Sequence, residues 1–143
     1  MMKIPRAFVG WEVLVVDDEQ DNLEVASRLL KIAGATVTMT SNGVEALQKV
    51  QGRSLPFKFV LSDLSMPDMD GWELLYLLQQ EKVMQNIPVI ALTAHAMAGD
   101  RERCIAAGFL DHISQPLDPM SFIQQIVKLL TPLPDYAPLL ETI

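Results

Sequence analysis

Phe59-Val60-Leu61-Ser62 is a short, largely apolar run that is followed by Asp63 and then by Leu64-Ser65-Met66-Pro67. A second apolar run, Val13-Leu14-Val15-Val16, ends in Asp17 and Asp18. Short and continuously apolar runs are typical of parallel strands that are covered on both faces. Because the carboxyl ends of parallel strands meet at one edge of the sheet, the carboxylates are predicted to form one acidic pocket.

Strand-like and helix-like segments alternate around these two runs, judged by whether apolar residues run together or recur at three and four residues. The predicted strands are Glu12–Val16, Thr36–Thr40, Phe59–Ser62, Pro88–Leu92 and Asp111–Ser114. The predicted helices are Gln20–Ile32, 41–51, Gly71–Gln80, Met97–Ala107 and 118–130. This order predicts an α/β fold with a doubly wound, five-stranded parallel sheet whose strands are joined by right-handed crossovers.

Two helix starts carry residues that favour the N-cap position. Ser41 is expected to cap the second helix, and Asp118 the last one. The spacing of Val44, Leu47 and Val50 predicts that these three side chains face the core.

The composition indicates one globular domain. The chain has 143 residues, of which 50% are hydrophobic and 20% charged. We expect a short N-terminal extension over residues 1–10, the domain over 11–130, and a C-terminal tail over 131–143. The tail holds three prolines and is expected to be neither helix nor strand.

Charge and cysteine content argue against several classes of protein. The net charge is −7 and the 11 basic residues are scattered, so we expect no nucleic-acid partner. The single Cys104 excludes an internal disulfide, fits a reducing compartment and is expected to be a packed thiol. No apolar run approaches the roughly 18 residues of a membrane span, and no signal peptide is visible, so a cytoplasmic location is expected.

Two more polar residues are predicted at the acidic edge. Thr93 ends the fourth strand and Gln115 follows the fifth. Clustered carboxylates raise one another's pKa and destabilise a fold, and a hard cation such as Mg²⁺ relieves that repulsion. Helix capping explains Asp18 or Asp70 singly, but it does not explain three carboxylates and a hydroxyl at one edge.

The motifs resemble those of the receiver domain of two-component response regulators over about residues 11–130. The matching stretches are Val15-Val16-Asp17-Asp18-Glu19, Leu61-Ser62-Asp63-Leu64-Ser65-Met66-Pro67-Asp68-Met69-Asp70-Gly71, Ala91-Leu92-Thr93-Ala94, Ala106-Ala107-Gly108 and Gln115-Pro116. The Asp-x-x-Met-Pro-x-Met-Asp-Gly stretch is highly specific, whereas the aspartate pair alone is weak. The resemblance implies a flavodoxin-like sheet with strand order 2-1-3-4-5.

The resemblance also implies an aspartyl-phosphate switch, with Asp63 as the nucleophile that accepts a phosphoryl group. Mg²⁺ (or Mn²⁺) would be bound by Asp18, Asp63 and the Ser65 backbone carbonyl, and by Asp17 through water. Thr93 would hydrogen-bond the attached phosphoryl group. His112 occupies the position of the family's aromatic switch residue.

The chain departs from the family at Gln115, where the family has an invariant lysine. Pro116 matches, and the Gln115–Pro116 peptide is expected to be cis by resemblance. Glutamine donates a hydrogen bond but carries no charge, and Arg101 is a candidate replacement cation. Two hypotheses follow: a phosphoacceptor with a weakened switch, or a degenerate receiver that acts as a phosphorylation-independent adaptor.

The expected partners are a histidine kinase or a histidine phosphotransfer protein, and a downstream protein that binds about residues 98–130. The protein is not expected to be an enzyme beyond its own phosphorylation and dephosphorylation. A haloacid-dehalogenase-like phosphatase would need an acid at Ser65. A flavodoxin-like cofactor protein would need a phosphate loop where Asp17-Asp18-Glu19 stands, and the nucleotide-binding P-loop motif is absent.

Overall fold

A five-stranded parallel sheet forms the centre of the protein, in the order β2-β1-β3-β4-β5. The computed structural model describes residues 4–94 and 98–140. The strands are β1 (Glu12–Val16), β2 (Thr36–Thr40), β3 (Val60–Asp63), β4 (Val89–Thr93) and β5 (Asp111–Ser114). The predicted fold class and strand order are therefore confirmed.

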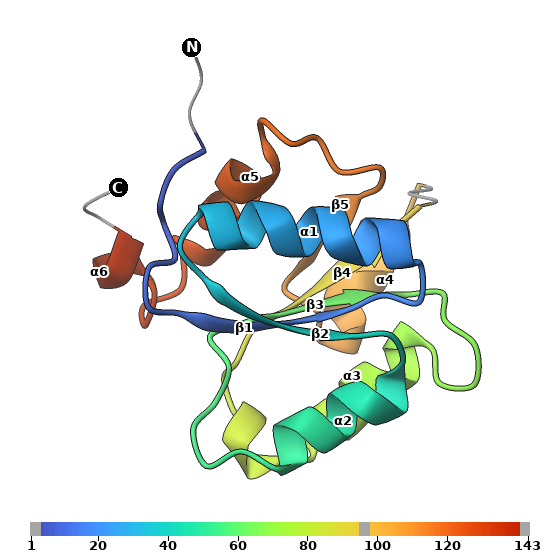
Figure 1. The fold of residues 1–143 in the computed structure, drawn as a ribbon. Helices are drawn as coiled ribbons and strands as arrows, with labels where there is room; N and C mark the ends of the chain where they lie inside the picture. Colours follow the sequence, from blue (N-terminus) through green and yellow to red (C-terminus); the bar gives the residue numbers. More distant parts are fainter. Residues whose placement is uncertain (1–3, 95–97, 141–143) are drawn as a thin grey trace.

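Helices cover both faces of the sheet (Figure 1). They are α1 (Gln20–Ile32), α2 (Gly43–Gln51), α3 (Gly71–Gln79), α4 (Asp100–Ala107), α5 (Phe122–Leu130) and α6 (Ala137–Leu140), with a 3-10 turn, η1, at Lys82–Met84. One core cluster packs α1 and α5 against the sheet, and the other packs α2, α3 and Cys104 of α4 against the opposite face. The burial of Cys104 agrees with the expectation of a packed thiol.

Two strands end one residue later than predicted. The register pairs Val60 with Val89 and Asp63 with Leu92, so the ladder extends to the carboxylate. Pro88 has no N–H to donate, and only its carbonyl takes part, accepting from the Val60 N–H. Asp63 and Thr93 are consequently the last residues of β3 and β4.

The predicted cap and inward face of α2 were partly wrong. Asn42, rather than Ser41, caps this helix, because its side-chain oxygen accepts a hydrogen bond from the Glu45 N–H at 2.8 Å. Val44 is exposed, contrary to expectation, while Val50 is buried. The face that packs on the sheet is set by Gly43, Ala46 and Val50, which lie three and four residues apart.

Two other helices begin later than predicted. Helix α5 begins at Phe122, since Asp118 holds a preceding turn in which its carboxylate accepts from the Met120 N–H and the Ser121 hydroxyl. Helix α4 begins at Asp100; the predicted start at Met97 lies outside the described residues.

The segments 4–11 and 133–140 pack together at the amino side of the sheet (Figure 1). The prediction that the tail is neither helix nor strand was wrong, because residues Ala137–Leu140 form α6. Pro138 lies in its first turn, where a missing N–H removes no helical hydrogen bond. Tyr136 and Leu140 are buried in the same core cluster as Phe8 and Trp11. None of the helices in the described part is long and apolar enough to cross a membrane.

Candidate functional site

Three carboxylates meet at the carboxyl edge of the sheet, as the sequence predicts. Asp17 and Asp18 follow β1 and Asp63 ends β3, and one carboxylate oxygen from each lies within 4.8 Å of the other two. Asp17 is fully buried, Asp63 is 8% exposed, and Asp18 lies at the surface. The cluster therefore has two inner carboxylates and one that faces solvent.

Backbone amides hold the two inner carboxylates in place. The Glu19 N–H donates to Asp17 Oδ1 at 2.9 Å, and the Ser65 N–H donates to Asp63 Oδ1 at 3.2 Å. Gly71 at the start of α3 packs directly against the strand end, and a Cβ there would lie 2.3 Å from the Asp63 carbonyl oxygen. The glycine of the Asp-Gly motif is thus required by close approach rather than by a left-handed backbone.

Ionisation of the two inner carboxylates is unfavourable in the folded protein. Burial, reinforced by the charge of Asp17, raises the pKa of Asp63 from 3.8 to about 7. Burial likewise raises the pKa of Asp17, against the lowering effect of hydrogen bonds from the Glu19 backbone and the Gln115 side chain. Carboxylates held at such cost are the donor set that a hard divalent cation satisfies.

Gln115, which follows β5, directs its side chain toward the carboxylate cluster. Its Nε2 donates to Asp17 Oδ2 at 3.0 Å, and its backbone N–H donates to the Thr93 carbonyl at 2.8 Å. The Gln115–Pro116 peptide is cis, as the resemblance implied. The direct bond to Asp17 was not foreseen, because the two residues are 98 positions apart and no local spacing connects them.

Thr93 and His112 lie on neighbouring strands with different relations to the cluster. Thr93 ends β4 opposite Ser114, and is buried at the carboxyl edge beside the Gln115 backbone. His112 pairs with Ala91, two residues further back along the ladder. Its Nδ1 is buried without a hydrogen-bond partner in the described part of the chain, and lies 3.8 Å from Asp111 Oδ1.

Arg101 is engaged elsewhere. Its Nε lies 3.2 Å from Asp111 Oδ2, so this pair links the start of α4 to β5. The suggestion that Arg101 supplies the missing cation is not supported by this position.

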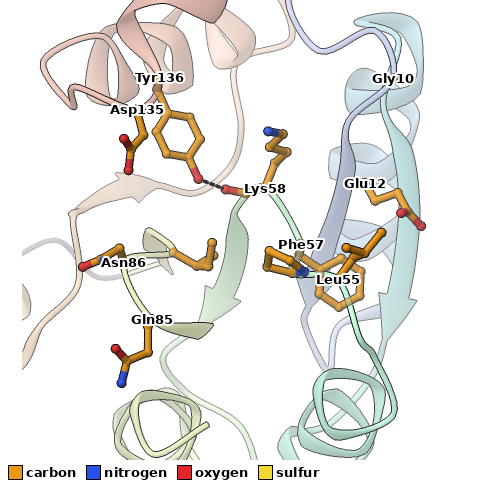
Figure 2. A pocket seen from close by; sticks show the side chains of 11 residues that line it. Gly10, Glu12, Leu55, Phe57, Lys58, Gln85, Asn86, Asp135 and Tyr136 are labelled. Carbon is orange, nitrogen blue, oxygen red and sulfur yellow. Dashed lines mark hydrogen bonds between the residues drawn. The ribbon is translucent and has the colours of Figure 1, made fainter. Parts of the chain in front are cut away.

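A separate cavity of about 450 Å³ lies at the opposite edge of the sheet (Figure 2). It is lined by residues that precede or begin strands, such as Gly10, Lys58 and Ile87, and by Tyr136 of the tail. The Tyr136 hydroxyl donates to the Lys58 carbonyl, whereas the polar side chains of Glu12, Gln85 and Asn86 point in different directions. At this cavity the tail is held to the sheet through Tyr136, and the lining side chains do not converge on a common point as those of a catalytic site do.

Comparison with known proteins agrees with this fold. The response regulator receiver domain model matches residues 13–127. The chain is 38% identical over 106 residues to the signal transduction histidine-protein kinase BarA of Escherichia coli K12, which covers 74% of this chain and 11% of BarA. It is 34% identical over 114 residues to the polar-differentiation response regulator DivK of Brucella anthropi, which covers 80% of this chain and 91% of DivK.

A solved structure gives the same result. The receiver domain of the sensor histidine kinase PA1611 from Pseudomonas aeruginosa superposes with a TM-score of 0.73 at 30% identity, covering 85% of this chain and 96% of that chain. That structure has a magnesium ion coordinated in its active-site cleft. The chain belongs to the response regulator receiver family, whose members act as switches in phosphorelay signalling rather than as classical enzymes.

Proposed function

We propose that Asp63 accepts a phosphoryl group from a phosphohistidine on a histidine kinase or a histidine phosphotransfer protein. The observation that carries this proposal is the cluster of three carboxylates within 4.8 Å at the carboxyl edge of the sheet. An Asp63 oxygen attacks the phosphorus atom, the phosphorus–nitrogen bond breaks, and the imidazole leaves with the bonding electron pair. The product is an aspartyl phosphate at the end of β3.

Mg²⁺ (or Mn²⁺) fits the donor set of this cluster. Asp18, Asp63 and the Ser65 backbone carbonyl would hold it directly, and Asp17 would do so through water. When bound, the cation neutralises charge between the attacking carboxylate and the phosphoryl oxygens. The raised pKa values of Asp17 and Asp63 support this assignment, because they show that the chain alone leaves the charges uncompensated.

Thr93 and Gln115 would donate hydrogen bonds to the oxygens of the phosphoryl group once it is attached to Asp63. The Thr93 hydroxyl and the Gln115 amide can each donate a hydrogen bond at this edge, but neither carries charge. Replacing a charged donor by a neutral one costs on the order of 1.5–3 kcal/mol, or about one to two decades in an equilibrium constant. The phosphorylated state would therefore be less stable than with lysine, while the chemistry is retained.

A downstream protein would bind the surface formed by α4, β5 and α5. This surface, about residues 98–130, carries His112 at the switch position and the Arg101–Asp111 pair. Turning of the Thr93 hydroxyl toward the phosphoryl group would open space beside His112 and alter what a downstream protein binds.

The test is the intact mass of the protein after incubation with acetyl phosphate and Mg²⁺. Asp63→Asn and Gln115→Lys are measured beside the native chain. The native chain is expected to gain one phosphoryl group, Asp63→Asn none, and Gln115→Lys the same group with a longer lifetime.

A different result would contradict the proposal that the native chain is a phosphoacceptor. If only Gln115→Lys gained the group, the lysine loss would have disabled the acceptor. The chain would then be a receiver that binds partners in its unmodified form.

A further inference from the structure

One edge of the sheet is open. Strand β2 pairs only with β1 among the described residues. The Thr36 N–H donates to the Trp11 carbonyl and the Asp17 N–H to the Thr40 carbonyl, so even-numbered residues of β2 face β1. The backbone N–H and C=O groups of Val37 and Met39 therefore point away from the sheet.

Nothing in the sequence of this edge protects it. Proteins normally guard an exposed edge with charges, prolines or a bulge. Strand β2 reads Thr-Val-Thr-Met-Thr, without a charge or a proline. Its outward backbone groups are available to pair with an added strand.

Strand β2 runs beside α1 (Figure 1). Side chains of α1 and Met39 of β2 line a groove between them. Glu24, Ser27, Arg28 and Lys31 recur at three and four residues, so they form one stripe of the helix. With Ile32 and Met39 they line a cavity of about 420 Å³. Ile32 is 46% exposed and Met39 41% exposed, so the groove has an apolar floor that the described chain leaves uncovered.

A buried hydroxyl in this groove has no partner. Ser27 is 2% exposed, and its Oγ makes no hydrogen bond within the described part of the chain. A serine inside a helix usually satisfies its hydroxyl with a carbonyl one turn earlier or with solvent. The Oγ atom is itself shielded from solvent, so this hydroxyl is not presented to a group in the groove.

The side chains that line the groove carry a small positive net charge on an acidic protein, because Arg28 and Lys31 outnumber Glu24. Arg28 and Lys31 are exposed and form no ion pair with the residues that the structure describes, whereas the whole chain carries a net charge of −7. Arg28 and Lys31 therefore favour an anionic group beside them, whereas Glu24, which accepts a hydrogen bond from Gln20, opposes one at its own position.

We propose that the β2 edge and the α1 groove bind an extended acidic peptide segment of a partner protein as an added strand. The backbone of the segment would pair with Val37 and Met39. Alternate side chains would point toward α1, where carboxylates meet Arg28 and Lys31 and apolar groups cover the groove floor. This surface lies apart from Asp63, so the binding does not depend on phosphorylation.

The probe is a fluorescent peptide that alternates glutamate with valine, and its binding is followed by anisotropy. The peptide is expected to bind the native chain, and Arg28→Glu with Lys31→Glu to weaken binding by about tenfold or more. Lys49→Glu with Lys82→Glu, two exposed residues outside the groove, reverses the same number of charges and is the matched control, which is expected to bind like the native chain. Amide exchange of Val37 and Met39 is expected to slow in the complex.

Three results would overturn the proposal. One is the absence of binding at millimolar peptide. Another is equal binding by the variant with reversed groove charges or by a lysine–valine peptide. The last is protection of Val37 and Met39 without peptide in a dimer seen by sedimentation, which would assign the edge to a second copy of the chain.

Discussion

Asp63 is held in an environment that opposes its own ionisation. The side chain is buried beside the carboxylate of Asp17, and the pKa is raised to about 7. Gln115 compensates only part of this charge, since its amide hydrogen-bonds Asp17 and cannot neutralise it. A free carboxylate at the end of β3 is thus maintained against stability, as expected of a group kept for chemistry.

This cost gives the metal-free protein an unusual dependence on pH. The pKa of Asp63 is raised on folding, so the folded state holds a proton that the unfolded state releases between pH 3.8 and about 7. Stability therefore falls as pH rises through that window. From about pH 5 to about pH 8 in a chelator, the free energy of unfolding is expected to drop by roughly 2–3 kcal/mol, measured by urea denaturation.

Two comparisons identify Asp63 as the cause. Asp63→Asn carries no charge at any pH and is expected to lose most of this slope. Mg²⁺ is expected to stabilise the native chain more at about pH 8 than at about pH 5, because it binds the ionised form. An unchanged slope in Asp63→Asn would contradict the assignment.

At the scale of elements, the connection from β3 to α3 positions the candidate nucleophile. The Gly71 N–H donates to the Leu64 carbonyl at 2.9 Å, and Asp70 caps α3 by accepting from the Glu73 N–H. The helix start is thereby pulled against the strand end, with no room for a side chain at Gly71. The loop that carries Ser65 is fixed between these two anchors.

Gly71→Ala is expected to damage both stability and the site. Its Cβ would meet backbone atoms of Asp63 and Leu64, which cannot move as a flexible side chain can. The free energy of unfolding is expected to fall by about 1–3 kcal/mol, and phosphorylation by acetyl phosphate to slow. Gly52→Ala is the control: its Cβ would make only an ordinary contact at 3.5 Å, so a change within about 0.5 kcal/mol is expected. Equal effects of the two changes would refute the close-approach argument.

In the whole molecule, the described segments before β1 and after α5 contribute to one core. Trp11 lies 5.0 Å from Phe8 in a stacked arrangement and 5.9 Å from Tyr136 in an edge arrangement, measured between ring centroids. The family match covers residues 13–127, so all three aromatic residues lie outside it. This cluster closes the amino side of the sheet, opposite the acidic edge.

Tyr136→Ala is expected to lower the free energy of unfolding by roughly 3 kcal/mol, because it leaves a cavity beside Trp11. Tyr136→Phe removes only the hydrogen bond to the Lys58 carbonyl and is expected to cost about 1 kcal/mol. Leu139→Ala is the matched control, since Leu139 is 45% exposed and Tyr136 only 5%. Thermal denaturation measures all three, and phosphorylation of Asp63 should remain intact. If Tyr136→Ala left the free energy of unfolding unchanged, the tail would not contribute to the stability of the core.

The five strands, their parallel arrangement and the meeting of Asp17, Asp18 and Asp63 can all be predicted from the amino-acid sequence. These features follow from local apolar patterns and from the rule that parallel strands share one carboxyl edge. Family resemblance added the strand order and the cis Gln115–Pro116 peptide, both of which the structure has.

Contacts between side chains at distant sequence positions depend on how the elements pack together. Three such contacts could not be predicted from the spacing of residues along the chain. They are the hydrogen bond from Gln115 to Asp17, the ion pair of Arg101 with Asp111, and the packing of Tyr136 on Trp11. Val44 is exposed, and the proline-containing tail forms a helix. Both outcomes depend on how each segment packs against the rest of the protein. Periodicity fixes the type of an element, but contacts between elements are selected by packing of the complete chain.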